Sequence, residues 1–185
     1  MRSLFAKEIT SLAKVNKDIV LLSGDIGNRM FDEFKHFAPE RFINCGIAEA
    51  NMMSLAAGMS LGGLRPFVYT ITPFTTTRCL EQIKIGGCYH KSSLTIVGTG
   101  SGLSYSELGA THHSFEDIGI IRTLPDIKIF TPADNVELDR SIKASLDYEG
   151  PSYIRIGKKG EPLVHSSSED FSHFIKHGKD IALIC

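Results

Sequence analysis

Short apolar runs that end in small or polar residues recur along this chain, with helical patterns between them. The first run spans residues 19–22 and ends in Ser23, Gly24 and Asp25. Because polar residues do not alternate with the apolar ones, such a strand is buried on both faces, as in a parallel sheet. Repeated alternation of strands with helices predicts an α/β fold, an open and mostly parallel sheet with helices on both faces.

Periodicity and turn residues predict the other elements. Further strands are expected over residues 41–45, 65–71, 93–98, 128–131 and 152–156. Helices are expected over residues 4–15, 30–36, 52–63, 74–85, 115–124 and 136–148. In open parallel sheets, functional residues gather in the loops beyond the carboxyl ends of the strands. Those loops supply Asp25, Glu49, Phe74 and His112, which we therefore expect at one edge of the sheet.

The chain is long enough for one sizeable core, since 42% of its 185 residues are hydrophobic. We predict a single domain over residues 1–158. Residues 159–179 are rich in Ser, His and acidic side chains and are predicted to be a linker. The apolar run within residues 180–185 is typical of the first strand of a further domain in a longer protein.

The charge and cysteine patterns exclude several classes of protein. The 20 basic and 21 acidic residues are mixed along the chain, which argues against nucleic acid or a membrane surface as a partner. No apolar run is long enough to span a membrane, and the first residues do not form a signal-peptide pattern. The four cysteines lack metal-binding spacing, so we expect reduced thiols, no metal site and a cytoplasmic location.

A single carboxylate, Glu49, lies among Ile, Ala and Met residues between a predicted strand and a predicted helix. This setting makes the side chain costly to ionise unless a partner pairs with it, so we expect its pKa to be raised. A carboxyl group that is protonatable near neutral pH suits proton transfer to a ring nitrogen. The alternative is an ordinary first-turn glutamate that faces water and complements the helix dipole.

Two adjacent histidines, His112 and His113, follow a glycine-rich loop. By themselves they fit a solvated helix entry, and adjacent histidines without a second ligand pair do not make a zinc site. The glycines at 98, 100 and 102 lack the lysine of a phosphate-binding loop. We expect them to bend the backbone or let it move.

A set of short motifs runs through residues 21–156 in a fixed order. They are LSGD at 22–25, GIAEAN at 46–51, AAG at 56–58, RPF at 65–67, PF at 73–74, EQI at 81–83, THH at 111–113 and FTPAD at 130–134. In this order they resemble the pyrimidine-binding domain of thiamine-diphosphate enzymes of the transketolase group. The resemblance implies the fold predicted above and a subunit that transfers a two-carbon ketol unit between sugars.

The resemblance also implies a role for each candidate residue. Glu49 would hydrogen-bond the ring nitrogen of the cofactor's pyrimidine and so activate the cofactor, which acts as an electron sink. Phe74 would stack on the pyrimidine, and Arg78 and Asp25 would lie near the cofactor. Each of these residues also has an ordinary structural explanation. Phe74 could pack within a helix, Arg78 could face solvent, and Asp25 could cap a turn.

On the substrate side, His112 would contact the oxygen of the donor and take part in proton transfer, with His113 beside it. Transketolases carry an acidic residue shortly before the Thr-His pair. This chain has Leu108 there, with Glu107 one position earlier. The substrate implied is a sugar phosphate or a related ketose, and a non-standard ketose or another acyl donor stays open.

A second departure concerns the diphosphate. The family binds it through a divalent metal, Mg²⁺ or Ca²⁺, held by a Gly-Asp-Gly stretch in another domain, and no such stretch occurs in this sequence. We therefore expect the C-terminal subunit of a split transketolase, whose partner is a diphosphate-binding N-terminal subunit that holds the metal. The assembly would be a homodimer or a heterotetramer.

Other functions of the same fold stay open. The alternatives are a deoxyxylulose-phosphate-synthase-like subunit, a 2-oxo-acid dehydrogenase beta-like subunit and a non-catalytic scaffold. The motifs at 46–49 and 111–114 are at least as close to the synthase pattern, but the synthase carries its diphosphate domain on the same chain. Dehydrogenase beta subunits usually lack the Thr-His-His loop, and a scaffold would have no use for a desolvated carboxylate.

Overall fold

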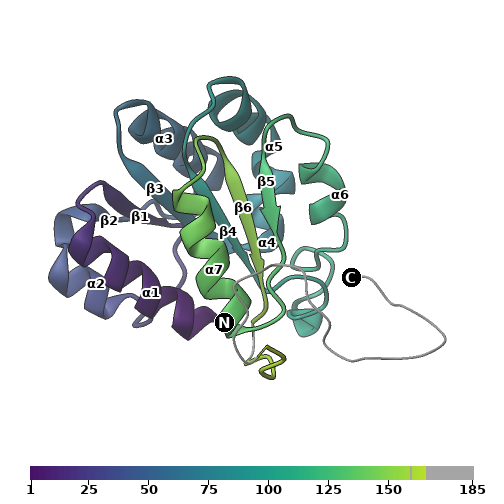
Figure 1. The fold of residues 1–185 in the computed structure, drawn as a ribbon. Helices are drawn as coiled ribbons and strands as arrows, with labels where there is room; N and C mark the ends of the chain where they lie inside the picture. Colours follow the sequence, from purple (N-terminus) through teal and green to yellow (C-terminus); the bar gives the residue numbers. More distant parts are fainter. Residues whose placement is uncertain (159, 166–185) are drawn as a thin grey trace, which may run out of the picture.

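The computed structural model describes residues 1–158 and 160–165, and a six-stranded sheet forms its centre (Figure 1). All paired strands run parallel, in the order β2-β1-β3-β4-β6-β5. The strands are β1 (Ile19–Ser23), β2 (Phe42–Asn44), β3 (Arg65–Ile71), β4 (Thr95–Thr99), β5 (Lys128–Phe130) and β6 (Ser152–Ile156). The predicted fold class is confirmed, and each strand predicted within residues 1–158 is present.

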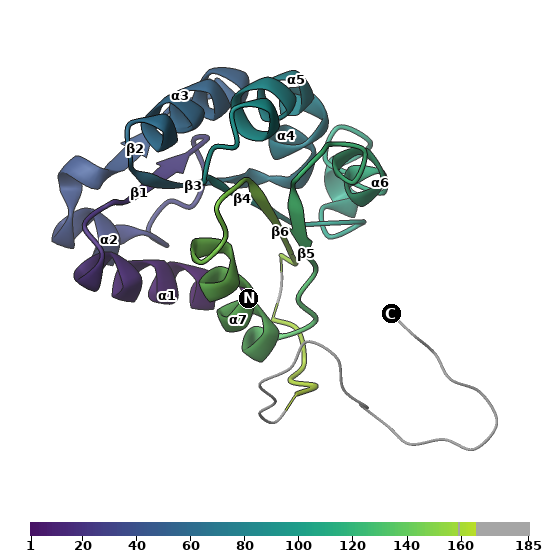
Figure 2. The ribbon, with the colours of Figure 1, turned by 45° about the horizontal axis from the view of Figure 1, so that its top comes forward.

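Helices cover both faces of this sheet (Figure 2). On one face lie α1 (Arg2–Val15), α2 (Asp32–Phe37) and α7 (Asn135–Leu146). On the other lie α3 (Glu49–Leu61), α5 (Leu80–Gln82) and α6 (Asp117–Ile121). The short α4 (Thr72–Thr75) directly follows β3 at the carboxyl end of the sheet.

Each face of the sheet has its own apolar core. The core beneath α1, α2 and α7 contains an aromatic cluster, in which Phe5 stacks on Tyr69 with ring centroids 5.5 Å apart and Phe31 meets Tyr69 edge-on at 5.1 Å. The core beneath α3 and α6 is mainly aliphatic and includes the fully buried Met52 and Met53. Every residue of β1 and β4 is buried, as expected of inner strands of a parallel sheet.

The helix predicted over residues 74–85 is broken into short pieces. These are α4, the 3₁₀ turn η2 (Thr77–Cys79), α5 and the π-helix η3 (Ile83–Tyr89). The hydroxyl groups of Thr75 and Thr76 both donate to the carbonyl of Thr72, at 3.0 and 2.7 Å. Such side-chain bonds compete with the backbone ladder, and β-branched side chains lose rotamer freedom in a helix. The run of threonines therefore accounts for the break.

The described part of the predicted linker, residues 160–165, contains neither helix nor strand. Its end is tied to α7, because the backbone N–H groups of Val164 and His165 donate to the Asp134 carboxylate at 2.8 and 2.7 Å. Asp134 is also the N-cap of α7 and accepts from the backbone of Val136 and Glu137. One buried carboxylate thus joins the linker to the domain.

The rest of the predicted linker and the strand predicted within residues 180–185 lie outside the described residues. The domain boundary near residue 158 therefore stays a prediction. Among the helices of residues 1–158 and 160–165, none has the length and apolar character needed to cross a membrane.

Candidate active site at the carboxyl edge of the sheet

Glu49 is the first residue of α3, which begins there and not at Met52 as predicted. Gly46, with a φ of 68°, turns the chain between β2 and this helix. Glu49 is only 4% exposed, so it does not face water. Its carboxylate nevertheless lies in the first turn, where it complements the helix dipole.

The loop after β1 packs directly against Glu49. A Cβ atom placed on Gly24 would lie 3.4 Å from Glu49 Cγ and 3.1 Å from Thr70 Cβ. Contacts this close leave little room for any larger residue. Gly24 therefore lets the chain after β1 pack against the Glu49 side chain.

Arg78 supplies the counter-charge to this buried carboxylate. Its Nη1 lies 2.9 Å from Glu49 Oε1 in an ion pair, and its side chain is 44% exposed. The burial expected for Glu49 is observed, and the partner that the sequence left open is Arg78. The pair joins α3 to η2, two segments that are well separated along the chain.

Phe74 and His112 continue this group of contacts. The guanidinium carbon of Arg78 lies 3.9 Å from the centroid of the Phe74 ring. The His112 ring meets the same phenyl ring edge-on, with centroids 5.1 Å apart and planes at 68°. The structure thus brings Glu49, Phe74, Arg78 and His112 together from α3, α4, η2 and the loop after β4.

Tyr105 and Lys158 extend the group beyond His112, and reasoning from the sequence missed both. The ring centroids of Tyr105 and His112 are 6.0 Å apart, and Lys158 Nζ lies 4.1 Å from the Tyr105 centroid. Lys158 also pairs with Glu107 at 2.7 Å. Lys158 follows the carboxyl end of β6, so the same edge rule that selected the other candidates would have found it.

The loop that carries His112 takes its shape from two glycines. Gly100 and Gly102 have φ values of 75° and 61°, which confirms the expected bends there, whereas Gly98 lies within β4 and does not bend the chain. A Cβ on Gly100 would collide with the Tyr105 ring. The Thr111 hydroxyl lies 2.9 Å from His112 Nδ1 and fixes one nitrogen of the imidazole.

Asp25 and His113 have other contacts. Asp25 is exposed with a φ of 55°, and its Oδ1 accepts a hydrogen bond from Asn44 Nδ2 at 3.1 Å. His113 Nε2 lies 3.2 Å from the carbonyl oxygen of Ser106. No contact with Glu49, Phe74 or Arg78 is described for either residue, so their proposed roles rest on the family resemblance alone.

The cysteine next to Arg78 is chemically inert. Burial, together with the charge of Glu49, raises the pKa of Cys79 to about 12. Its thiol donates to the carbonyl oxygen of Phe74 at 3.1 Å. Cys45, Cys79 and Cys88 are free thiols, as expected, and Cys185 lies outside the described residues. Cys79 therefore fills space beside the site and supplies no nucleophile.

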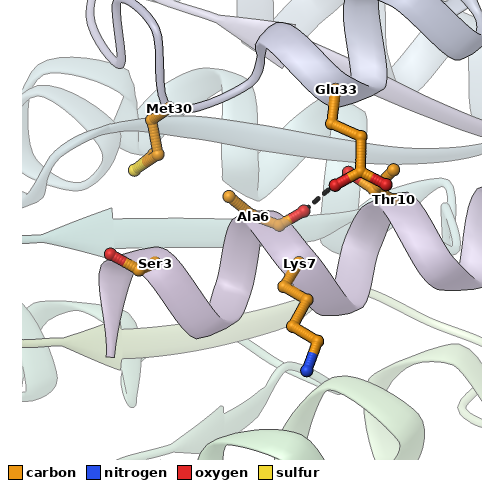
Figure 3. A pocket seen from close by; sticks show the side chains of 6 residues that line it. All are labelled: Ser3, Ala6, Lys7, Thr10, Met30 and Glu33. Carbon is orange, nitrogen blue, oxygen red and sulfur yellow. Dashed lines mark hydrogen bonds between the residues drawn. The ribbon is translucent and has the colours of Figure 1, made fainter.

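A small pocket lies elsewhere, between α1 and α2 on the opposite face of the sheet (Figure 3). Its volume is about 200 Å³, and its lining consists of Ser3, Ala6, Lys7, Thr10, Met30 and Glu33. It contains none of the predicted site residues. The Thr10 hydroxyl in its wall donates to the carbonyl of Ala6 at 2.7 Å, within the same helix.

The group around Glu49 suits a planar nitrogen heterocycle. A buried carboxyl can bond a ring nitrogen, while the face of Phe74 can stack on the ring. His112 lies at the edge of the same phenyl ring and is the residue type best suited to proton transfer near neutral pH. The arrangement therefore has groups that can recognise a ring and carry out acid–base chemistry beside it.

The chain is similar to known transketolases. Residues 1–161 match the family described as transketolase, pyrimidine binding domain. A subunit of the apulose-4-phosphate transketolase of Phocaeicola vulgatus is 33% identical over 190 residues, which cover 99% of this chain and 61% of that protein. A subunit of the 6-deoxy-6-sulfo-D-fructose transketolase of Clostridium sp. is 28% identical, with coverages of 100% and 59%. The chain spans less than two thirds of the length of these relatives.

Solved structures show the same fold. A split-gene transketolase, solved as an inactive β4 tetramer, superposes with a TM-score of 0.82 at 36% identity. The superposition covers 97% of this chain and 59% of the transketolase chain. The transketolase of Campylobacter jejuni superposes with a TM-score of 0.81 at 21% identity, with coverages of 89% and 26%. Because the family match covers most of the sequence and the fold agrees, this chain belongs to the transketolase pyrimidine-binding domain family.

Proposed function

We propose that this chain is the C-terminal subunit of a split transketolase and provides the pyrimidine end of a thiamine-diphosphate site. The observation that carries the proposal is the environment of the Glu49 carboxyl. Glu49 is only 4% exposed, and Arg78 contacts both its carboxylate and the Phe74 ring. A pyrimidine fits these residues, because its ring nitrogen can bond Glu49 while its face lies on Phe74.

Thiamine diphosphate, when bound, supplies the carbon nucleophile and the electron sink for breaking a bond beside a carbonyl. Glu49 holds the proton at the pyrimidine nitrogen, and its low-dielectric setting strengthens that hydrogen bond. Gly24 lets the chain after β1 pack against the Glu49 side chain, which is 4% exposed and so largely shielded from water. His112, with Nδ1 occupied by the Thr111 hydroxyl, retains Nε2 for a substrate oxygen.

The names of two relatives bear on the substrate. One names apulose 4-phosphate and the other 6-deoxy-6-sulfo-D-fructose, and each of these sugars carries an anionic group. We propose a ketose with a phosphate or sulfonate group for this chain, with Lys158 as the cation that receives it. Lys158 is paired with Glu107, whose side chain is 59% exposed, and such ion pairs exchange partners at little cost.

The partner follows from the same comparisons. Two relatives are named as subunits, and the β4 tetramer of a split-gene transketolase is described as inactive. We propose that the diphosphate is held through Mg²⁺ by an N-terminal subunit, which completes the site. This chain alone would then hold only the pyrimidine half.

Calorimetry with thiamine diphosphate and Mg²⁺ tests the proposal on this chain, on the partner and on their mixture. Tight binding that depends on Mg²⁺ and occurs in the mixture alone is the expected result. Tight binding by this chain alone would show that the site is not shared, and no binding by any sample would favour a scaffold.

A further inference from the structure

We propose that Arg78 is a placeholder for the pyrimidine: its guanidinium occupies the position between Glu49 and Phe74 in the cofactor-free protein and leaves when the cofactor binds. The inference rests on the proposed function, because it assigns Glu49 and Phe74 to the pyrimidine. It gives Arg78 a role opposite to that of a cofactor ligand.

The two contacts of the guanidinium are the contacts that a pyrimidine needs. Arg78 Nη1 forms an ion pair with Glu49 Oε1 at 2.9 Å, on the carboxylate that a protonated ring nitrogen would contact. The guanidinium carbon lies 3.9 Å from the centroid of the Phe74 ring, over the ring face that a pyrimidine would cover. Guanidinium and pyrimidine are both planar and delocalised. Because both would fill the same space, they exclude one another.

Arg78 is the member of the group that can move. Its side chain is 44% exposed, and it belongs to a 3₁₀ turn of three residues that follows the break at Thr76. Glu49 is 4% exposed and packs against Gly24, and neighbouring residues of α3 belong to the core. Withdrawal of Arg78 toward solvent therefore disturbs little, whereas withdrawal of Glu49 would disrupt packing.

Before the cofactor binds, the Arg78 guanidinium reduces two energetic costs at the site. A buried carboxylate without a counter-charge or a hydrogen bond is costly, and the exposed phenyl face would add apolar surface. The guanidinium offsets both costs until a ligand that makes the same contacts replaces it. A permanent cofactor ligand would instead stand beside the Glu49–Phe74 position and leave it open.

Competition of this kind lowers the apparent affinity of the cofactor. The apparent Kd equals the intrinsic Kd divided by the fraction of molecules in which Arg78 is withdrawn. A partly exposed ion pair with a cation–π contact leaves that fraction at roughly one in ten. Arg78→Met, which keeps the length but removes the hydrogen-bond donors, should therefore bind thiamine diphosphate about tenfold more tightly.

The experiment uses the complex of this chain with its diphosphate-binding partner, thiamine diphosphate with Mg²⁺, and calorimetry. Arg78→Met should bind about tenfold more tightly than wild type. Arg78→Lys keeps the charge but loses the planar guanidinium, so its Kd should lie between those of the wild type and Arg78→Met. Arg122→Met is the matched control at an exposed arginine and should leave the Kd unchanged. Equal or weaker binding by folded Arg78→Met overturns the placeholder but not the proposed function. Absence of binding by the wild-type complex overturns both.

A second measurement needs no variant. Crystal structures of the wild-type complex should show Arg78 on Glu49 and Phe74 without cofactor, and withdrawn from both when thiamine diphosphate is bound. An Arg78 that keeps its contact with Glu49 in the loaded complex would overturn the proposal.

Discussion

The Glu49–Arg78 ion pair leads to a stability prediction that requires no partner subunit. Arg78→Met leaves the buried carboxylate without its counter-charge. Removing one partner of a fully buried pair costs about 3–5 kcal/mol, whereas an exposed pair contributes about 0.2–1 kcal/mol. Here one side chain is 4% exposed and the other 44%, so solvent screens part of the interaction. We expect the free energy of unfolding at pH 7 to fall by about 1–2 kcal/mol.

A double-mutant cycle isolates the pair from other effects of the substitution. In a Glu49→Gln background, Arg78→Met should lower the free energy of unfolding far less than it does in the wild type. The difference between the two effects gives a coupling energy of about 1 kcal/mol. Urea unfolding of the purified chain, followed by circular dichroism, measures all four proteins. Arg122→Met, at an exposed position, should change stability by less than about 0.5 kcal/mol in either background. A coupling energy below about 0.3 kcal/mol would refute the reasoning, because Arg78 would then not stabilise the buried charge.

Three further predictions concern the substrate side and the linker. His112→Ala should lower kcat of the complex by about 100-fold or more with little change in the Kd of thiamine diphosphate, and His113→Ala should lower kcat less. Steady-state kinetics measure kcat, and calorimetry measures the Kd. Lys158→Met should raise KM about tenfold for an anionic ketose, and an equal rise for an uncharged ketose would contradict the assignment. Burial alone would raise the pKa of Asp134, but the hydrogen bonds that it accepts from backbone N–H groups and from His165 outweigh burial and lower it. The ionised Asp134 therefore stabilises the folded protein fully above about pH 4, and this stabilisation is lost as the pH falls toward the pKa of Asp134 in the folded state. Asp134→Asn should lower the free energy of unfolding in urea by about 1–3 kcal/mol at pH 7, and this loss should shrink below about pH 4.

The order of strands and helices was predictable, because the physics behind it is local. Unbroken apolar runs such as residues 19–22 have to be buried on both faces, and alternation with helices leaves a parallel sheet as the solution. The break after α4 was not predicted. It depends on hydroxyl bonds of Thr75 and Thr76 that compete with the helix, and a periodicity argument does not count such bonds.

The site was predictable to the extent that topology determines it. The edge rule placed Glu49, Phe74 and His112 at one end of the sheet, where they lie close together. The pairing of Glu49 with Arg78 was not predicted, because it depends on the path of the chain through the broken helix. Lys158 was missed because the rule was not applied to the last strand.

The central claim is that the buried carboxyl of Glu49 activates the cofactor. The most direct test is the rate of two-carbon transfer by the complex that carries Glu49→Gln, at saturating thiamine diphosphate, compared with wild type and with Glu149→Gln. The account predicts a fall of about 100- to 1,000-fold for Glu49→Gln, as for the loss of a transition-state partner, and no change for Glu149→Gln. A fall of less than about threefold for Glu49→Gln would contradict it.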